Sequence, residues 1–309
     1  MVHALHIPLR WKDLDPTALG ERILLLGATD SGKSTFARYL VHRLLEAGLR
    51  PAYLDCDIGQ STLGLPTTMN LAVPSEVLRT AEEGAPFPPQ PGASFFVGSI
   101  TPRGHMLPLL VGCQRLLEQA RELGARPVVV DTTGLIDPAQ GGLALKQWKV
   151  ELVRPHTVIA LVKGRELEPI LWPLRLAGSP RVVELPVSPE ARPRDRAERI
   201  ARRQRLLNRY FHGAGLLAFP LGRLPIFDLY RAAAGRLAGL QDREGFTLAL
   251  GVVEKLDRET GTLWLRTPLQ DAGQVASLRI GTCWLQQGNA PPVSPARPRP
   301  QHPGHHREP

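Results

Sequence analysis

Residues 27 to 35, GATDSGKST, combine glycines, a lysine and hydroxyl side chains at the spacing G-x-x-x-x-G-K-[ST]. Gly27 and Gly32 allow the backbone to curl so that its N–H groups point at phosphate oxygens. Lys33 is then expected to reach the β- and γ-phosphates of a nucleotide, and Ser34 to hold Mg²⁺. The apolar run ILLL precedes the motif and a helical pattern follows it, which is the context that the motif requires. The sequence predicts a nucleoside triphosphate site formed by Gly27, Ala28, Thr29, Asp30, Ser31, Gly32, Lys33, Ser34 and Thr35.

Two aspartates follow the second apolar run, in the segment YLDCDIGQST at positions 53 to 62. Ligands of open α/β sheets bind at the carboxyl ends of the strands, which is where this segment falls. If the strand stays extended, Asp55 and Asp57 point to the same side. One carboxylate could support a metal ion while the other accepts a proton from an attacking hydroxyl. The alternative is a loop cap and a solvated carboxylate, but a pair of aspartates beside a phosphate loop favours the functional interpretation.

A third aspartate, Asp131, ends the apolar run in VVVDTTGLI at positions 128 to 136. A carboxylate at the end of the strand next to a phosphate loop typically orients Mg²⁺ or its water. Thr133 and Gly134 follow it, close to where the γ-phosphate is expected. The sequence therefore predicts metal contacts from Ser34, Asp57 and Asp131, without deciding which aspartate touches the metal directly.

An arginine-rich stretch, RPRDRAERIARRQRLLNRYF at positions 192 to 211, predicts a helix from about Asp195 to Phe211. In a helical projection its apolar side chains gather on one side, and some of the arginines fall on that same side. The planar fork of arginine suits phosphate oxygens, and arginines above a phosphate loop stabilise charge on the transferring phosphoryl group. We expect three arginines to form a lid over the nucleotide: Arg196, Arg199 and Arg203.

The other arginines of this predicted helix, Arg202, Arg205 and Arg209, fall roughly opposite the apolar side. They are either a grip for nucleic acid or a solubilising face, and the sequence leaves both interpretations open.

The elements that position these residues form an alternating pattern from about residue 21 to 215. Apolar runs such as RILLLG, PAYLD, PVVVD, TVIALV and RVVELP are separated by helical patterns near 33–47, 107–123 and 143–152. This order predicts an α/β domain, a mainly parallel sheet with helices on both faces.

The rest of the chain has a different character. Residues 1 to 20 form a short lead-in. Residues 216 to 288 contain LALGVVEKLDRETGTLWLRTPL, β-type runs around a turn, which predicts a small β-rich domain of antiparallel strands. Residues 289 to 309 are rich in proline and nearly free of apolar residues, so we expect a disordered tail.

Charge and composition narrow the partners. The formal net charge is +9 and the sequence pI is about 10.0, which favours polyanions such as nucleic acid, although an excess of arginine can also be a compositional bias. No Asn-Lys-x-Asp motif, with which Ras-type GTPases read guanine, occurs in the sequence. ATP, or a relaxed choice of base, is therefore favoured over strict use of GTP.

The cysteines Cys56, Cys113 and Cys283 are far apart and odd in number, so neither a disulfide framework nor a zinc site is indicated. A reducing, cytoplasmic location fits this pattern. The first residues lack the long apolar run of a signal peptide, and no apolar stretch approaches the roughly 20 residues of a membrane helix. No membrane association is expected.

Five segments together resemble a known family. GATDSGKST, LDCDIGQS, FFVGSITPRG (95–104), VVVDTTGLI and the arginine-rich helix ending in YFHG occur in the order seen in the polynucleotide 5′-hydroxyl kinases. This family includes the kinase of pre-mRNA cleavage and tRNA-splicing complexes and its ribosomal-RNA-processing relatives. The resemblance covers roughly residues 10 to 285, and the β-rich C-terminal part is similar to that of the family's shorter, prokaryotic-type members. The most specific segments are the D-x-D-x-G-Q run and the arginine helix.

The resemblance implies transfer of the γ-phosphate of ATP, with Mg²⁺, to the 5′-OH of RNA or DNA. It implies that Lys33 and Ser34 bind phosphate and Mg²⁺, that Asp57 is the general base, and that Arg199 and Arg203 belong to the lid. The residues it places along the substrate are Asp55, Gln60, Ser99, Thr101, Thr133 and Gly134. Asp131 stands where some relatives have an uncharged residue, and the lead-in is much shorter than the N-terminal domain of the eukaryotic member. Trp11 could therefore stack on a base or simply pack.

Two other functions stay open at this point. The chain could be an RNA-binding P-loop NTPase that acts as a regulatory or assembly factor in RNA processing. A small-metabolite kinase is the third possibility, but it would not explain the outward arginines. The expected partner is single-stranded or end-exposed RNA or DNA with a 5′-OH, and no stable protein partner can be inferred from the sequence.

Overall fold

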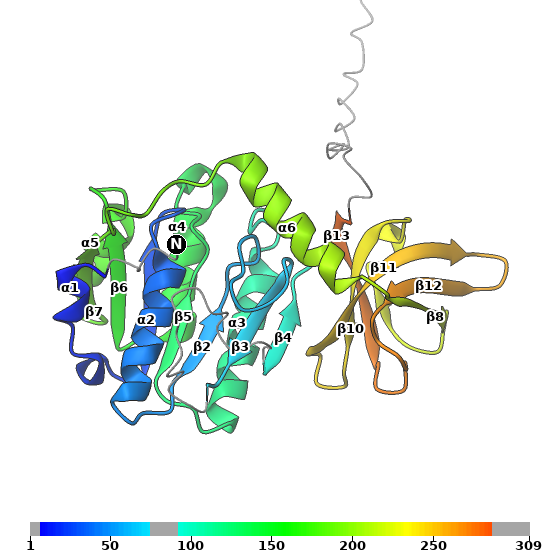
Figure 1. Ribbon diagram of the computed structural model, residues 1–309, viewed down its shortest axis with the longest axis horizontal. Coiled ribbons are helices and arrows are strands. Elements are labelled where there is room, and N and C mark those ends of the chain that lie inside the picture. Colours follow the sequence, from blue (N-terminus) through cyan, green and yellow to red (C-terminus); the bar gives the residue numbers. More distant parts are fainter. Residues whose placement is uncertain (1–6, 75–91, 286–309) are drawn as a thin grey trace, which may run out of the picture.

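The computed structural model describes residues 7–74 and 92–285, and Figure 1 shows their two β-sheets. The first sheet has the strand order β4-β3-β2-β5-β1-β6-β7. Its strands are β1 (Arg22–Gly27), β2 (Ala52–Asp55), β3 (Thr68–Ala72), β4 (Ala93–Phe96), β5 (Val128–Asp131), β6 (Thr157–Val162) and β7 (Arg181–Pro186). Strands β2, β5, β1, β6 and β7 pair in parallel, whereas β3 and β4 extend the sheet antiparallel at one edge. The continuous apolar runs reflect burial on both faces, as is typical of parallel strands.

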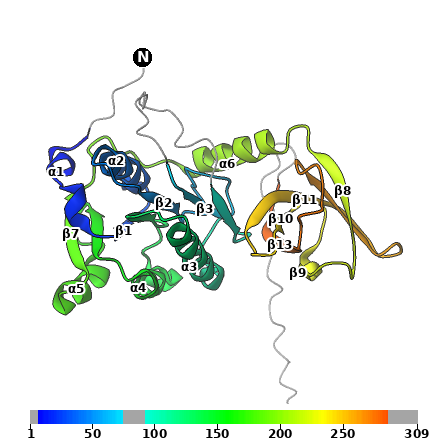
Figure 2. The same ribbon diagram turned by 90° about the horizontal axis from the view of Figure 1, so that it is seen from below.

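Helices cover both faces of this sheet (Figure 2). One face carries α1 (Leu9–Lys12) and α2 (Lys33–Glu46), whose buried side chains form one core with β1. The other face carries α3 (Met106–Glu122), α4 (Gly142–Val153) and α5 (Glu168–Ala177), which form a second core. Short 3₁₀ turns lie at Pro16–Leu19 and Pro138–Gln140. The expected α/β architecture is confirmed, and the phosphate-loop sequence lies at the carboxyl end of a central strand.

Trp11 is a packing residue. Its ring is 1% exposed, contacts Phe36 edge to face at 4.9 Å, and donates from Nε1 to the Pro186 carbonyl at 3.1 Å. The alternative that Trp11 stacks on a nucleotide base is wrong, because the ring lies inside the core between α1, α2 and β7.

The second sheet has the strand order β8-β12-β11-β10-β13-β9. Its elements are β8 (Gly215–Pro220), β9 (Ile226–Phe227), the 3₁₀ turn η3 (Leu229–Arg231), β10 (Arg236–Gln241), β11 (Thr247–Asp257), β12 (Thr262–Thr267) and β13 (Ser277–Trp284). All pairings are antiparallel except that of β9 with β13. The expected antiparallel strands around the DRETG turn are present as β11 and β12.

Helix α6 (Arg196–Tyr210) leads from the first sheet to the second (Figure 1). Asp195 and Glu198 form a capping box at its first turn. Leu207 and Phe211, at its far end, are buried with Phe96 of β4 and Leu250 of β11, so this end docks where the two sheets meet.

The limits of the four segments expected from the sequence stay predictions. The proline-rich tail at 289–309 lies outside the described residues. Within the described part of the chain, no helix has the length and apolar character needed to cross a membrane.

Candidate active site

The phosphate loop joins β1 to α2 and its shape depends on its glycines. Gly32 has a φ of +84° and immediately precedes the first turn of α2, and a Cβ at Gly27 would lie 2.5 Å from Ser31 Oγ. Lys33 is nearly buried, and its Nζ donates to the Ala28 carbonyl at 2.7 Å. Burial lowers the pKa of Lys33, while the carboxylates of Asp131, Asp57 and Asp30 act in the opposite direction. The phosphate loop, the Lys33 ammonium group and the positive N-terminal end of α2 lie together, and this combination suits the negative charge of a triphosphate.

The arrangement of Ser34 and Asp131 fits Mg²⁺. Ser34 Oγ donates to Asp131 Oδ2 at 2.5 Å, and the buried Asp131 Oδ1 has no hydrogen-bond partner within the described residues. Burial, the largest cause, raises the pKa of Asp131, whereas Lys33 and Ser34 oppose that rise. A hydroxyl and a carboxylate are hard oxygen ligands, and Mg²⁺ usually adds water and substrate phosphates to one or two carboxylates. No cluster of three or more acidic, histidine or cysteine side chains able to hold a metal occurs in residues 7–74 and 92–285.

Asp55 shapes a loop instead of facing a substrate. It is fully buried, and its oxygens accept hydrogen bonds from the backbone of Asp57, Thr62 and Leu63 and from Ser61 Oγ, at 2.7 to 3.1 Å. Burial, followed by the charges of Asp131 and Asp57, raises its pKa to about 7. The expected substrate contact of Asp55 stays a prediction, and it is not favoured by the structure, since the loop uses both of its oxygens.

Asp57 lies in the cleft above the phosphate loop. Its Oδ1 accepts from the backbone N–H groups of Gly59 and Gln60, at 3.0 Å each, and its side chain lines the same cleft as Lys33. The expectation that an extended strand would point Asp55 and Asp57 to the same side does not apply, because β2 ends at Asp55 and Asp57 lies in the loop that follows. Gln60 also lines the cleft, and neither atom of its buried amide group has a partner in the described chain.

The segment after Asp131 packs directly on the phosphate loop. Thr29 Oγ1 donates to the Gly134 carbonyl at 3.3 Å, and a Cβ at Gly134 would lie 2.5 Å from the Thr29 Cα. Thr133 is nearly buried. Lys146 of α4, fully buried, donates to Thr132 Oγ1 at 2.8 Å and to the Thr133 carbonyl. Lys146 was not predicted as a site residue. Its position among the apolar residues of the predicted helix near 143–152 could have indicated a buried lysine.

The lid is attached to the phosphate loop through one carboxylate, Asp30. Its Oδ2 accepts from Arg199 Nη2 at 2.6 Å and from the Arg194 backbone N–H at 3.1 Å, and its Oδ1 lies 3.4 Å from Arg194 Nε. Burial raises the pKa of Asp30, but the hydrogen bonds of Arg194 and Arg199 outweigh it, so the pKa is lowered overall. Arg194 was missed because it precedes the predicted helix.

The other lid arginines do not lie as the helical projection predicted. Arg202, expected to face outward, lines the cleft and donates to the Ser61 carbonyl at 2.8 Å, and Arg205 also lines the cleft. Arg203 lies on the side of Cys283, within electrostatic reach of Asp57. Arg196 is exposed and does not line the cleft. The projection fails because only Leu207 is buried within α6, so the first half of the helix spans the cleft instead of docking one face on a core.

Ser99 and Thr101 do not line the nucleotide cleft. Ser99 is 2% exposed and exchanges hydrogen bonds with the backbone of Thr101. The turn nevertheless packs against the Asp57 loop, because a Cβ at Gly59 would lie 2.6 Å from the Ile100 carbonyl oxygen. These two residues belong to a turn that packs behind Asp57, and their substrate contacts stay predictions, which the burial of Ser99 does not favour.

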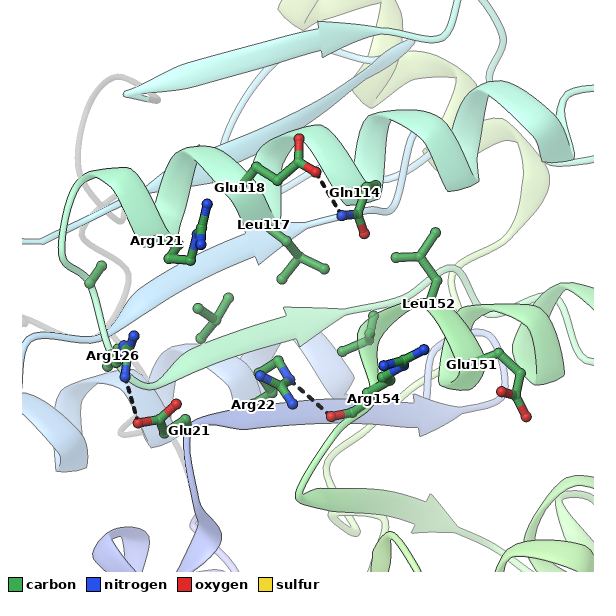
Figure 3. A pocket seen from close by; sticks show the side chains of 13 residues that line it. Glu21, Arg22, Gln114, Leu117, Glu118, Arg121, Arg126, Glu151, Leu152 and Arg154 are labelled. Atoms are coloured by element: carbon green, nitrogen blue, oxygen red, sulfur yellow. Dashed lines mark hydrogen bonds and ion pairs between the residues drawn. The ribbon is translucent and has the colours of Figure 1, made fainter.

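A second cleft lies at the opposite edge of the first sheet, at the amino ends of β1 and β5 (Figure 3). Its volume, about 670 Å³, is similar to the 610 Å³ of the cleft above the phosphate loop. Figure 3 shows Arg126 paired with Glu21, and Arg22 donating to the Arg154 carbonyl. Its charges are mixed, and it lacks a glycine-rich loop.

A β-strand, a glycine-rich phosphate loop with Lys33 and Ser34, and a helix, set in a mainly parallel sheet, define a P-loop phosphate-binding protein. Residues 27–213 match the model of the mRNA cleavage and polyadenylation factor CLP1 P-loop family. This match covers more than half of the chain, and the chain belongs to that family.

Archaeal relatives carry the name polyribonucleotide 5′-hydroxyl-kinase. The chain is 34% identical to that of Pyrococcus furiosus over 200 residues, which are 65% of this chain and only 53% of the relative. It is 28% identical to that of Methanocaldococcus jannaschii, over 84% of this chain and 86% of the relative. A solved structure of Clp1p in complex with Pcf11p has the same fold, with a TM-score of 0.66 at 13% identity over 86% of this chain and 75% of Clp1p.

Proposed function

We propose that this chain is an ATP-dependent polynucleotide 5′-hydroxyl kinase. The observation that carries the proposal is that Lys33, Ser34 and Asp57 line one cleft. Lys33 and Ser34 are the candidate donor residues, and Asp57, with one oxygen held by two backbone N–H groups, is the candidate base. The names of the archaeal relatives support RNA as the acceptor.

In the proposed reaction, the 5′-oxygen of the nucleic acid attacks the γ-phosphorus of ATP. The new bond joins the 5′-oxygen to that phosphorus, the bond from the phosphorus to the β–γ bridging oxygen breaks, and ADP leaves. Asp57 accepts the proton of the 5′-hydroxyl. Lys33 and the lid arginines Arg194 and Arg199 stabilise negative charge on the transferring group. Ser34 and Asp131 would hold Mg²⁺, which supplies further positive charge at the phosphates.

The first experiment is transfer of label from γ-labelled ATP to short oligonucleotides bearing either a 5′-OH or a 5′-phosphate, as RNA and as DNA. We expect label only on the 5′-OH strands, and none with Lys33→Ala. Lys255→Ala is a matched control, because Lys255 is exposed on β11 of the second sheet and does not line the cleft. The RNA and DNA arms give the substrate class directly.

The same experiment separates the alternative functions. Release of free phosphate that is stimulated by RNA, with no labelled strand, would replace the kinase with an RNA-binding NTPase. Labelling of a small hydroxyl metabolite in preference to any oligonucleotide would point to a metabolite kinase.

One prediction on cellular context, the location, remains a proposal. A cytoplasmic location is proposed from the cysteine pattern, and Cys56, Cys113 and Cys283 are all free in the structure. We make no proposal of a protein partner. Clp1p is bound to Pcf11p in its solved structure, but the likeness at 13% identity concerns the fold alone.

A further inference from the structure

Three exposed aromatic rings of the second sheet each have an arginine beside them. Phe227, Tyr230 and Trp284 are 45%, 80% and 40% exposed. The guanidinium carbons nearest these rings lie at 4.5, 5.1 and 3.1 Å from the ring centroids, and they belong to Arg279, Arg231 and Arg236 respectively. We call these six residues the arginine–aromatic strip.

The members of the strip are joined to one another. Asp228 lies 3.8 Å from Arg231 Nε and 3.5 Å from Arg279 Nη1, so one carboxylate holds two of the guanidinium groups in place. Phe227 pairs with Arg279 across β9 and β13, and Arg236 pairs with Trp284 across β10 and β13. Burial and then the charge of Arg231 lower the pKa of Arg236. The strip therefore has more positive than negative charge.

Exposure distinguishes this strip from the other arginine–aromatic contacts of the described chain. Tyr39, Phe211 and Phe246 also lie beside arginines, but their rings are buried or half-buried. Those contacts stabilise the fold. Only in the strip are the rings open to a ligand.

One end of the strip is connected through backbone contacts to the turn that packs on the Asp57 loop. The Thr282 N–H donates to the Gly98 carbonyl at 2.8 Å, and Arg236 donates to the Thr282 carbonyl. The segment after Gly98 carries Ile100, whose carbonyl packs on Gly59 of the Asp57 loop. Cys283, next to Trp284, packs against the cluster that contains Leu207 and Phe211 at the far end of α6. The Trp284 end of the strip therefore lies next to the turn that supports the Asp57 loop.

We propose that the arginine–aromatic strip binds single-stranded nucleic acid downstream of the 5′ end that enters the cleft. Exposed rings give bases a surface for stacking, and arginines neutralise the phosphates between them, which is how proteins hold single strands without reading their sequence. The inference rests on the proposed kinase function, because that function brings a single strand to the cleft. It adds a binding site that lies outside the phosphate loop and the lid.

The test is the dependence of transfer on oligonucleotide length. Steady-state kinetics would compare Tyr230→Ala and Trp284→Ala with the unaltered protein, on 5′-OH RNAs from a dinucleotide to about 16 nucleotides, the range covered by single-strand sites. For the longest RNA, each substitution is expected to raise KM about tenfold, the lower-to-middle range for loss of one stacked base, with kcat unchanged. For the dinucleotide, KM and kcat stay as in the unaltered protein. The loss is expected at shorter lengths for Trp284→Ala than for Tyr230→Ala.

Trp148→Ala is the matched control, because Trp148 is 64% exposed on α4, away from the strip. An equal loss on the dinucleotide and the longest RNA would mean a general structural effect and would overturn the proposal. So would a KM that none of the strip variants changes at any length.

If no oligonucleotide is phosphorylated at all, the kinase function fails while the strip can still be tested. Fluorescence anisotropy with labelled single-stranded RNA, without ATP, then decides. Weaker binding by Tyr230→Ala than by Trp148→Ala supports the strip, and equal binding rejects it.

Discussion

The two walls of the nucleotide cleft are held by different forces. The phosphate loop sits between β1 and α2, elements whose apolar side chains are buried in one core, and its shape depends on backbone and glycines. The lid consists of Arg194 and the first half of α6, which has no buried side chain before Leu207. Ion pairs of Arg194 and Arg199 with Asp30 connect the lid to the phosphate loop.

This difference has consequences for binding. A wall supported by a packed core already has its bound conformation before the ligand arrives, so little free energy is lost in ordering it on binding. A wall held by a few polar contacts at the edge of solvent can change position, because such ion pairs are individually weak. We infer that the phosphate loop, together with Asp57 just after β2 and Asp131 at the end of β5, forms the fixed wall of the cleft, and that the lid is the wall that responds to ATP.

After the complete loss expected for Lys33→Ala, the largest effect is expected on the fixed wall, from Asp57→Asn. The substitution keeps an oxygen to accept from the Gly59 and Gln60 N–H groups but removes the proton acceptor. We expect kcat to fall about 10²- to 10⁴-fold, the usual contribution of a general base, with KM for ATP nearly unchanged. Single-turnover transfer from labelled ATP measures the chemical step. A kcat within a few-fold of the unaltered protein would rule Asp57 out as the base.

A clear effect is also expected at the link between the walls, from Asp30→Asn. Without this carboxylate Arg194 and Arg199 lose their common partner and repel each other, so we expect the lid to open. KM for ATP should rise about tenfold, corresponding to loss of one hydrogen bond to a charged group, with a smaller change in kcat. Hydrogen exchange of the first turns of α6 should become faster.

The pH dependence of the Asp30 ion pairs and a control variant add to the Asp30→Asn test. Because the pKa of Asp30 is lowered below its usual value, the link is present at neutral pH and weakens only as pH falls below about 4. Glu21→Gln, which removes the exposed ion pair with Arg126, should change neither KM nor exchange in α6. Tighter binding of ATP by Asp30→Asn would show instead that Asp30 competes with the phosphates for the arginines.

The sequence predicted the fixed wall far better than the lid, for a physical reason. The phosphate loop, Asp57 and Asp131 lie at strand ends, and local geometry alone fixes their place once the strands are recognised. The direction of Arg202 depends on how α6 docks between two sheets, and the docking residues Phe96 and Leu250 are remote in the chain. The partners of Asp30 and Lys146 are likewise long-range contacts that no local spacing encodes.

The position of Arg202 on the lid can be tested against Arg209. Both were expected to face outward, but Arg202 donates to the Ser61 carbonyl in the cleft whereas Arg209 is exposed. Arg202→Met keeps the aliphatic length and removes the charge. We expect kcat/KM to fall about tenfold for Arg202→Met, as for loss of one charged hydrogen bond, and by less than about twofold for Arg209→Met. Equal effects of the two substitutions would support the original prediction that Arg202 and Arg209 face the same way, outward.

The smallest effect is expected from Tyr53→Phe, which removes one hydroxyl from the interior of the fixed wall. The Tyr53 hydroxyl lies 3.0 Å from Thr62 Oγ1 and donates to Asp131 Oδ2 at 3.3 Å, so it connects the Asp57 loop to the candidate Mg²⁺ ligand. The ring itself is fully buried, and phenylalanine fills the same space. We expect the free energy of unfolding in urea to fall by about 1 kcal/mol, the net contribution of a typical hydrogen bond.

Activity should respond differently from stability in this variant. If the packed core fixes the wall, as the burial of β2 and β5 indicates, the loss of one hydroxyl leaves Asp131 and Asp57 in place. The KM for ATP and the Mg²⁺ concentration for half-maximal rate should then change less than about threefold, below the effect of an average hydrogen bond. A larger shift in the Mg²⁺ requirement alone would mean that polar contacts, and not only the core, position Asp131. The fixed wall would then depend on polar contacts as the lid does.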